Sequence, residues 1–206
     1  MNSYIQPRRW QQIVSKKDQD TLSNILNSNS VDWYITNSTV TADFKPQYDI
    51  DDRVMDTYNC THKIYMHNDY SKSPKIYTKY ASLVDIPKQM IYSIASDLNV
   101  EVIQIMQIRA NTIFQDLSFT DKNFNVPHMD YEDPDIISIL YYVDQSDGDT
   151  VVFDKYDGKQ LGEPNRFRPI RGSAIAFNSN QYHCSSNPIK TRRRIVINAC
   201  FKYKEK

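Results

Sequence analysis

Glycine is scarce in this chain: only four of the 206 residues are glycine, and no glycine-rich motif is present. The sequence contains no G-x-G-x-x-G, Walker loop, H-E-x-x-H or G-x-S-x-G, so the common nucleotide-binding, zinc-protease and serine-hydrolase classes lack their residues. All four glycines instead fall between short β-rich runs, where a turn needs a positive φ angle. Glycine therefore indicates turns in this chain and not a phosphate-binding loop.

Cysteine and long apolar runs are also rare. The three cysteines, Cys60, Cys184 and Cys200, are odd in number and form no C-x-x-C pair, which is typical of reduced thiols in a cytosolic protein. No run approaches the roughly eighteen apolar residues of a membrane-spanning helix, and the N-terminal MNSYIQPRRW lacks the apolar core of a signal peptide. We therefore expect a cytoplasmic protein with no membrane partner.

An excess of charge of either sign is absent too. Lysine plus arginine and aspartate plus glutamate each total 25, so the net charge is zero and no global signal indicates a nucleic acid or an anionic membrane as partner. The length, and the lack of a linker or internal repeat, favour a single domain over residues 1–206 that buries a core without disulfides.

The first hundred residues contain two amphipathic patterns. SKKDQDTLSNILN, residues 15–27, places leucine and isoleucine at helical spacing behind two aspartates, which predicts a short helix. DIPKQMIYSIASDL, residues 85–98, predicts a second helix with Asp85 as N-cap and Pro87 in the first turn. The alternating VDWYITN, residues 31–37, predicts a strand, and residues 41–80 predict long loops with short strands.

Runs rich in β-formers dominate the rest of the chain, separated by turn residues. They span residues 101–114, 136–143, 150–153, 166–170, 173–177 and 193–201. Strands at such short intervals indicate a sandwich or barrel with the helices packed outside, which is a mainly β or α+β fold. We expect residues 101–206 to form this core and residues 1–100 to supply supporting helices and loops.

The clearest chemical pattern lies in VPHMDY, residues 126–131. His128 and Asp130 are two positions apart, so in an extended segment their side chains point the same way. A 2-His-1-carboxylate triad binds non-haem Fe(II) and leaves coordination positions open for reactants. The third ligand must come from a distant strand, and His183, at the end of SAIAFNSNQYH, is the candidate.

A second H-x-D occurs earlier in the chain, where residues 67–70 read HNDY. It is followed by the polar YSKSPKIY and not by an apolar strand. We therefore interpret His62 and His67 as solvated loop histidines. Because H-x-D alone is a weak pattern, the residues that follow each copy decide between them.

Three consecutive arginines open the last β-rich run, RRRIVINACF. Alternation with a period of two places Arg194 on one face with Val196 and Asn198, and Arg193 on the other. Arg192 and Arg193 fit a solvated basic pair at a strand end. Arg194 abuts the apolar run, and a buried guanidinium requires an anionic partner such as a carboxylate.

In this order the residues resemble the 2-oxoglutarate and Fe(II) dependent oxygenases, in particular the prolyl-hydroxylase-like branch that includes many phage-encoded members. The resemblance covers residues 108–201 and rests on HMD, ILYYVD, DGDTVVF, GSAIAFNSNQYH and RIVINACF, although relatives often have a Gly-Gly pair near DGDT. It implies a double-stranded β-helix, a jelly-roll or cupin-like core, in agreement with the strand pattern. A phage source would place the protein in the host cytoplasm.

The resemblance also implies a mechanism. The iron ligands are His128, Asp130 and His183, the co-substrates are 2-oxoglutarate and molecular oxygen, and the products are succinate, carbon dioxide and an oxidised substrate. Related halogenases lack the carboxylate ligand so that a halide can bind. Asp130 therefore favours hydroxylation or oxidative demethylation.

Further residues are implied for the co-substrate. Arg194 matches the arginine that binds the far carboxylate of 2-oxoglutarate, with Arg193 or Arg192 as alternatives. The second tyrosine of ILYYVD commonly helps to bind the same carboxylate, which nominates Tyr142. Family members also carry polar residues on the strand before H-x-D, and these residues can touch the co-substrate or the substrate. Arg109 and Asn111 are the candidates here.

Two other functions are compatible with the sequence. A non-catalytic cupin-like binding module could use the histidines for another metal or for none. A hydrolase could use His183 with Cys184, but adjacent strand residues point to opposite faces, which disfavours activation of this thiol. For an oxygenase, the prime substrate stays open among a protein side chain, a free amino acid, a nucleobase and a metabolite, with the loops of residues 41–80 as expected substrate walls.

Overall fold

The computed structural model describes residues 5–40, 52–67, 73–154 and 161–206 of the chain. In these residues the helices are α1 (Lys16–Leu26) and α2 (Ala81–Asp97). The strands are β1 (Arg8–Trp10), β2 (Tyr34–Thr36), β3 (Val54–Met55), β4 (Asn59–Met66), β5 (Lys75–Ile76), β6 (Val100–Phe114), β7 (Phe124–Asn125), β8 (Ile136–Tyr142), β9 (Thr150–Phe153), β10 (Pro164–Phe167), β11 (Ala174–Asn178), β12 (His183–Ser185) and β13 (Arg193–Glu205). The fold is therefore mainly β with flanking helices, as the sequence predicts.

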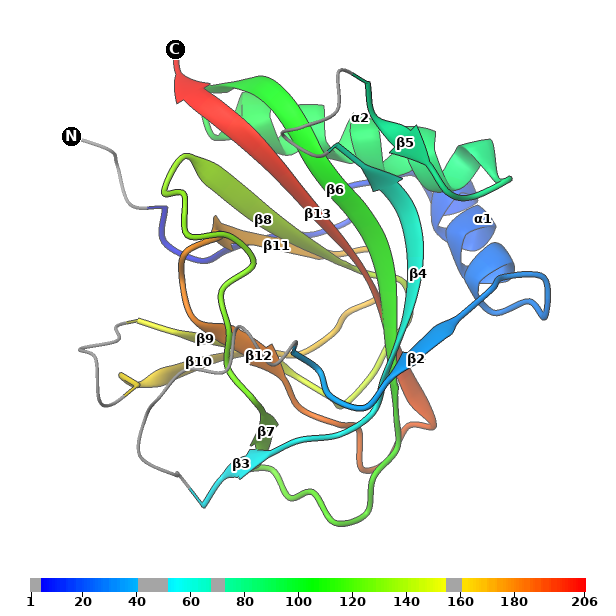
Figure 1. Ribbon diagram of the computed structural model, residues 1–206, viewed down its shortest axis with the longest axis vertical. Helices are drawn as coiled ribbons and strands as arrows, with labels where there is room; N and C mark the ends of the chain where they lie inside the picture. The colour runs from blue at the N-terminus through cyan, green and yellow to red at the C-terminus, as the bar shows by residue number, and fades with distance from the viewer. Residues whose placement is uncertain (1–4, 41–51, 68–72, 155–160) are drawn as a thin grey trace.

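Two sheets form the core (Figure 1). The larger has eight strands in the order β1-β11-β8-β13-β6-β4-β2, with β5 also paired to β4. The smaller has the order β10-β9-β12. From β8 onward the chain passes back and forth between the two sheets, and side chains from both pack together between them. This is the jelly-roll, or double-stranded β-helix, that the sequence predicts.

Both halves of the chain contribute to the large sheet. Strands β1, β2, β4 and β5 come from the first hundred residues, and β4 pairs directly with β6. Strand β4 reads NCTHKIYM, whose polar residues conceal its place in the sheet. An organisation as one domain over residues 1–206 stays our proposal.

Helices α1 and α2 cover the face of the large sheet that is turned away from the small one (Figure 1). Leu22 and Leu26 of α1 and Ile91 of α2 are almost fully buried in one cluster with Ile139 and Ile197 of the sheet. Fully burying such a side chain stabilises a fold by about 1.5–3 kcal/mol. This apolar layer leaves the other face of the same strands for polar residues.

Alternate residues of β8 and β13 face the space between the sheets. The register pairs Val196 with Tyr142, Asn198 with Leu140 and Cys200 with Ser138. Leu140, Tyr142 and Val196 pack there with Val152 of the small sheet. The faces predicted from period-two alternation, including the shared face of Ser138, Leu140 and Tyr142, are confirmed.

Helix α2 begins at Ala81, so the prediction of Asp85 as N-cap is wrong. Tyr80 is the N-cap, and its side chain makes no capping hydrogen bond. The added turn buries Leu83 and Val84, which are 0% and 5% exposed. Burial of these two side chains outweighs a capping bond worth about 1 kcal/mol. Pro87 consequently lies inside the helix and not in its first turn.

Three predicted strands have bounds that differ by two residues or more, and one of them, β13, continues four residues past the predicted end, from residue 201 to Glu205. Strand β10 covers Pro164–Phe167 and not residues 166–170. Pro169 has no N–H to donate to a sheet, so the strand ends before it. Strand β2 covers only Tyr34–Thr36 of the predicted residues 31–37, and it lies at the edge of the large sheet.

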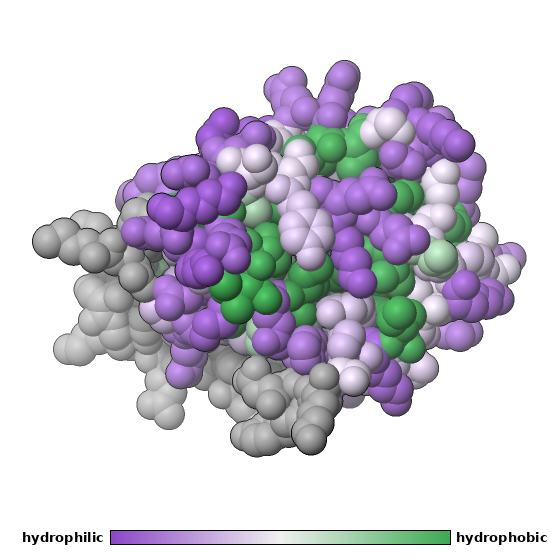
Figure 2. Space-filling model, turned by 90° about the horizontal axis from the view of Figure 1, so that it is seen from above, coloured by the Kyte–Doolittle hydropathy of each residue, from purple (hydrophilic) through white to green (hydrophobic). Residues whose placement is uncertain are grey.

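The surface combines polar and apolar groups. Seen from the end of the molecule at which β13 finishes, apolar side chains lie in the middle of the face with polar ones around them (Figure 2). Within the described residues, neither helix has the length and apolar character needed to cross a membrane.

Candidate metal centre

The two histidines that the sequence analysis combines lie side by side. His183 begins β12, and His128 forms an isolated antiparallel bridge with it. The N–H of each residue donates a hydrogen bond of 2.9 Å to the carbonyl oxygen of the other. Their ring centroids are 4.7 Å apart. The backbone itself therefore sets the spacing of the two imidazoles.

Each imidazole is oriented by a carbonyl oxygen two residues upstream. His128 Nδ1 lies 3.3 Å from the oxygen of Val126, and His183 Nδ1 lies 3.0 Å from the oxygen of Gln181. Because a carbonyl oxygen can only accept, these hydrogen bonds require the proton on Nδ1. The Nε2 atom of each ring then keeps a free lone pair, the form in which histidine binds a metal.

Asp130 completes the group from the same segment as His128. Its side chain is 1% exposed. The carboxylate accepts hydrogen bonds from Arg109 at 3.0 Å, from Ser138 at 2.7 Å and from Asn198 at 3.0 Å. Donors on three neighbouring strands, β6, β8 and β13, therefore hold the carboxylate in one orientation.

Burial and neighbouring groups set the protonation of these ligands. Burial, together with the proximity of His183, lowers the pKa of His128 to about 3. Burial raises the pKa of Asp130, but His183 and Arg109 outweigh it and hold this pKa below its ordinary value. At neutral pH the site thus offers a neutral imidazole at His128 and a carboxylate at Asp130, as binding of a divalent metal requires.

His128, Asp130 and His183 offer ligand atoms that all lie within 4.8 Å of one another. Asp130 Oδ2 and His183 Nε2 are 3.5 Å apart. Two imidazole nitrogens and one carboxylate are the donor set of non-haem Fe(II) sites, whereas Ca²⁺ and Mg²⁺ prefer oxygen ligands and structural zinc takes four protein ligands. The residues present therefore fit Fe(II).

A cavity of about 80 Å³ adjoins these ligands. His128, His183 and Arg194 all line it, with Asn111, Ile113 and Val196 among the other walls. We call it the inner cavity. It places the third arginine of RRRIVINACF in the same space as two candidate metal ligands.

Arg194 is buried in a polar pocket without an acidic partner. Its residue is 5% exposed, and it donates a hydrogen bond of 2.6 Å to Thr150 Oγ1. Its Nε has no hydrogen-bond partner, and among the described residues no carboxylate lies within 4.0 Å of it. A buried and unpaired cation is costly, so the inner cavity fits a ligand that carries a carboxylate.

Tyr142 lies beside Arg194 and is not among the residues that line the inner cavity. Its ring centre is 5.9 Å from the guanidinium carbon of Arg194. The Tyr142 hydroxyl donates to Thr150 Oγ1 at 2.9 Å, the same oxygen that accepts from Arg194. Thr150, which the sequence analysis did not single out, thus joins the two side chains. Direct contact of Tyr142 with a co-substrate stays a prediction.

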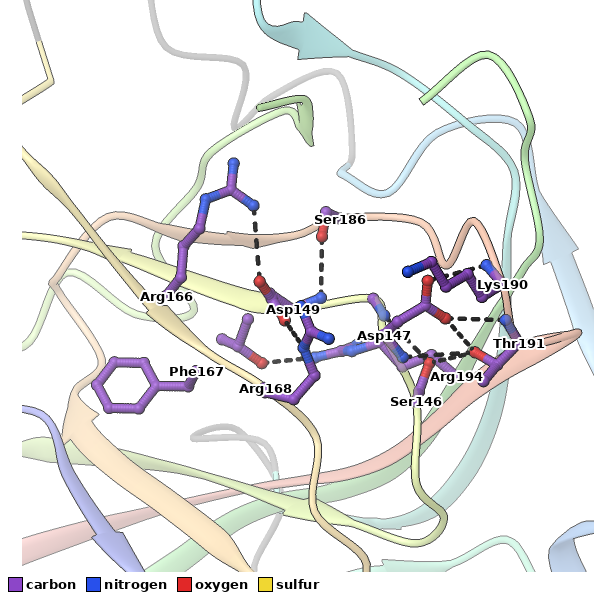
Figure 3. A network of polar contacts seen from close by, with 12 residues as sticks. Ser146, Asp147, Asp149, Arg166, Phe167, Arg168, Ser186, Lys190, Thr191 and Arg194 are labelled. Carbon is purple, nitrogen blue, oxygen red and sulfur yellow. Dashed lines mark hydrogen bonds and ion pairs between the residues drawn. The ribbon is translucent and has the colours of Figure 1, made fainter. Parts of the chain in front are cut away.

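A network of polar contacts lies next to Arg194 (Figure 3). Asp149 pairs with Arg168 at 2.9 Å. Asp147 accepts hydrogen bonds of 2.8 to 3.0 Å from the backbone N–H groups of residues 189–191. These bonds fix the loop that leads from β12 to β13. The loop carries no candidate metal ligand, but it sets where β13 begins and therefore where Arg194 lies.

The alternative residues of the sequence analysis lie less favourably. Arg193 donates a hydrogen bond to Asn27, and neither Arg193 nor Arg192 lines the inner cavity. Cys184 packs in an apolar cluster with Phe153, and burial raises the pKa of its thiol. A protonated thiol in such surroundings is a poor nucleophile.

The two histidines of the first half, His62 and His67, do not line the inner cavity. His62 is 6% exposed in β4, and its Nδ1 lies 3.0 Å from the carbonyl oxygen of Asp32. The interpretation of His62 as a solvated loop residue is therefore wrong. His67 follows β4, and its N–H donates to the carbonyl oxygen of Met106 at 2.8 Å. The rest of HNDY, residues 68–70, lies outside the described residues.

A second cavity, of about 410 Å³, adjoins the ligands from another side. It is lined by residues 36–40, Asn59, Thr61, Gln107, Arg109 and residues 128–130, and we call it the outer cavity. Thr39, Asn59, Arg109 and His128 line both cavities. The contribution of residues 36–40 was missed, because these polar side chains have no spacing pattern. Of the loops expected as walls, residues 41–51 and 68–72 lie outside the described residues.

No protein-family model and no curated protein matches the sequence. Solved structures are similar. An oxidoreductase of the 2OG-Fe(II) oxygenase family from Burkholderia pseudomallei is 12% identical, with a TM-score of 0.66 over 95% of this chain and 84% of its own. A Pseudomonas putida prolyl-4-hydroxylase is also 12% identical, with a TM-score of 0.52 over 95% of this chain and 91% of its own. The alpha ketoglutarate dependent epimerase SnoN from nogalamycin biosynthesis is 8% identical, with a TM-score of 0.62 over 95% of this chain and 78% of its own.

These likenesses extend over nearly the whole chain and show a shared fold. One neighbour is named as a member of the 2OG-Fe(II) oxygenase family and another as an alpha ketoglutarate dependent epimerase, SnoN, which has been solved with Fe³⁺ and alpha ketoglutarate. At identities of 8% to 12% the likeness carries the fold alone. A phage origin stays a prediction.

Proposed function

We propose that this protein is a 2-oxoglutarate and Fe(II) dependent dioxygenase. His128, Asp130 and His183 would hold the iron, and Arg194 would bind the far carboxylate of 2-oxoglutarate. Bound iron and 2-oxoglutarate would react with molecular oxygen, and 2-oxoglutarate would be converted to succinate and carbon dioxide. The same reaction would hydroxylate, or oxidatively demethylate, a prime substrate. We expect this activity in the cytoplasm.

The buried guanidinium of Arg194 carries the proposal. It lines the same cavity as His128 and His183, and it lacks a carboxylate partner within the described part of the chain. The planar guanidinium suits a carboxylate in bidentate geometry. The inner cavity thus has metal-binding histidines at one wall and the carboxylate-binding Arg194 at another. A 2-oxo dicarboxylic acid has matching ends, because its 2-oxo acid end can bind a metal and its far carboxylate can bind an arginine.

The chain's other residues prepare these groups. Ser138, Asn198 and Arg109 fix the Asp130 carboxylate, and two backbone carbonyls keep both imidazoles in the tautomer with a free Nε2. Thr150 accepts from both Arg194 and Tyr142, so the tyrosine acts on the guanidinium through a shared hydroxyl. Prepared ligands lower the reorganisation needed when metal and co-substrate bind.

A matched pair of arginine variants tests the proposal. Purified protein with Fe(II) should convert 2-oxoglutarate to succinate slowly without a prime substrate, as followed by NMR. Arg194→Met should raise the KM for 2-oxoglutarate about 100-fold, because a buried charge pair is lost. Arg193→Met, at the neighbouring position that faces α1, should leave this KM unchanged.

Equal KM values in the two variants would remove Arg194 from the co-substrate site. A protein that binds neither Fe(II) nor Mn(II), or whose metal affinity is unaffected by His183→Ala, would instead be the cupin-like module. All three cysteines are buried, so substitution tests the thiol: Cys184→Ala should leave turnover intact. Loss of activity in this variant would favour the hydrolase with Cys184.

A further inference from the structure

The outer cavity is walled mostly by neutral hydrogen-bonding groups. Residues 36–39 contribute hydroxyl and amide side chains, and Asn59, Thr61 and Gln107 contribute more. No Phe, Tyr or Trp of the described residues lines it. The polar groups can recognise a ligand by hydrogen bonds and charge, and the cavity also exposes apolar surface, to which Val40 and Met129 belong.

Two cations lie next to each other on the cavity face of the large sheet. Lys63 of β4 is directly opposite Arg109 of β6 in the antiparallel register. Such opposed residues have Cβ atoms about 4.5–5.5 Å apart on one face. Arg109 lines the outer cavity, and Thr61, two positions before Lys63, lines it as well. Alternation therefore places Lys63 on the same face of the sheet as Thr61 and Arg109, next to the residues that line the cavity.

This pair of like charges is only partly compensated. Arg109 donates to Asp130 at 3.0 Å, but its Nε is buried and has no hydrogen-bond partner. Lys63 is exposed, and it has no ion-pair partner among the described residues. Asp130 is itself a candidate metal ligand, and a divalent metal would use its negative charge. Directly opposed like charges destabilise a sheet, so an anion between them would relieve the repulsion.

We propose that the prime substrate is a small polar acid whose carboxylate or phosphate group binds between Lys63 and Arg109. This inference rests on the proposed function, because the molecule in the outer cavity would be the one oxidised beside His128 and Asp130. The uncharged part of the substrate lies against the hydroxyl and amide wall of residues 36–39. The acid group fixes the orientation of the molecule, and the neutral wall selects its shape.

Simple anions test the proposal without knowledge of the full substrate. Inorganic phosphate and acetate are the probes, and trimethyl phosphate and acetamide are their neutral counterparts. The protein is loaded with Mn(II) and saturating 2-oxoglutarate, which fills the inner cavity. Paramagnetic relaxation of the phosphorus and proton signals of the probes then reports binding near the metal. Both anions should show saturable relaxation, and the neutral probes should not.

Charge variants locate the anion. Lys63→Glu should weaken anion binding about tenfold or more, and Lys63→Arg should preserve it. Lys17→Glu makes the same change of charge on α1 and should have no effect. Anion binding that Lys63→Glu leaves unchanged, or relaxation as strong with neutral probes, would overturn the proposal. The ratio of the phosphate and acetate affinities identifies which acid the pair prefers.

A failure of the proposed function would be seen separately. If the protein does not bind Mn(II), the same probes are titrated into isotopically labelled protein without metal, and backbone amide shifts in β4 and β6 are followed. Shifts that saturate with anions and disappear in Lys63→Glu would retain the anion site although the oxygenase proposal had failed. An absence of such shifts would remove the anion site as well.

Discussion

The inner and outer cavities meet at His128, but they are lined by different kinds of structure. The inner cavity is walled by interior-facing residues of β6 and β13, which pair with each other over nearly their whole length. The outer cavity depends on residues 36–40, which follow the three-residue edge strand β2. Arg194 and His183 thus lie on strands, whereas His128 and Asp130 lie on the connection from β7 to β8. The outer cavity combines groups on strands β4 and β6 with residues 37–40 of a connection that can vary without disturbing the sheet.

Loss of a candidate metal ligand should have the largest effect. His183→Ala should abolish Fe(II) binding and lower the conversion of 2-oxoglutarate on the order of a thousandfold or more. His67→Ala, which changes the histidine of the other H-x-D, should alter neither quantity. Metal content and succinate formation measure the outcome. Metal binding that survives in His183→Ala would contradict the proposed metal site, and with it the roles proposed for the inner cavity and the outer cavity.

A smaller effect is expected from the groups that orient the carboxylate. Asn198 donates to Asp130 Oδ2 at 3.0 Å. Asn198→Ala should lower the affinity for Mn(II) about 10- to 100-fold, because partners of metal ligands typically contribute that much. Asn165→Ala, at the exposed position of β10, is the matched control. Titration calorimetry measures both affinities, and equal values would exclude this role for Asn198.

The shared hydroxyl of Thr150 should affect the inner cavity alone. Thr150→Val keeps the shape of the side chain but removes the acceptor for Arg194 and Tyr142. We expect the KM for 2-oxoglutarate to rise about tenfold with little change in kcat, since a hydrogen bond to a charged group is worth about 1.5–3 kcal/mol. Thr150→Ser should restore the KM. A serine variant as impaired as valine would indicate packing and not hydrogen bonding.

The smallest effect is expected at the wall of the outer cavity. Ser38 lines this cavity and not the inner one. Ser38→Ala should leave the KM for 2-oxoglutarate within about twofold, and it should cost about 1 kcal/mol of stability or less, because half-buried Ser38 loses one exposed hydrogen bond to Asp56. Kinetics and chemical denaturation measure the two quantities. A larger rise in KM would show that the cavities do not act separately.

The sequence was most informative where strands are buried on both faces. A slip of one residue would move every side chain of β13 to the other face, so the register is strongly specified. Alternation therefore separated Arg194 from Arg193 correctly, and it placed Ser138, Leu140 and Tyr142 together. The family resemblance added the order in which the motifs follow one another along the chain, and this order nominated His183 as the third ligand. The structure brings His128, Asp130 and His183 within reach of one ion.

The remaining features depend on contacts distant in the chain. Residues 36–40 reach the metal ligands because β2 pairs with β4 and β4 pairs with β6, and nothing in their own pattern indicates these pairings. The hydroxyl of Thr150 meets Arg194 across two sheets. Helix α2 starts early because the tertiary core buries Leu83, which a local capping rule does not take into account.

Because of the backbone bridge between His128 and His183, metal binding depends on folding of the chain as well as on the ligand side chains. Its two hydrogen bonds join segments that are separated by β8, β9, β10 and β11, so the paired imidazoles exist only once these strands are in place. A metal that binds the finished fold and not the unfolded chain stabilises the fold by mass action. Under the proposed function, the iron supply of the cell would then set how many molecules stay folded and escape proteolysis, and not only how fast each one works.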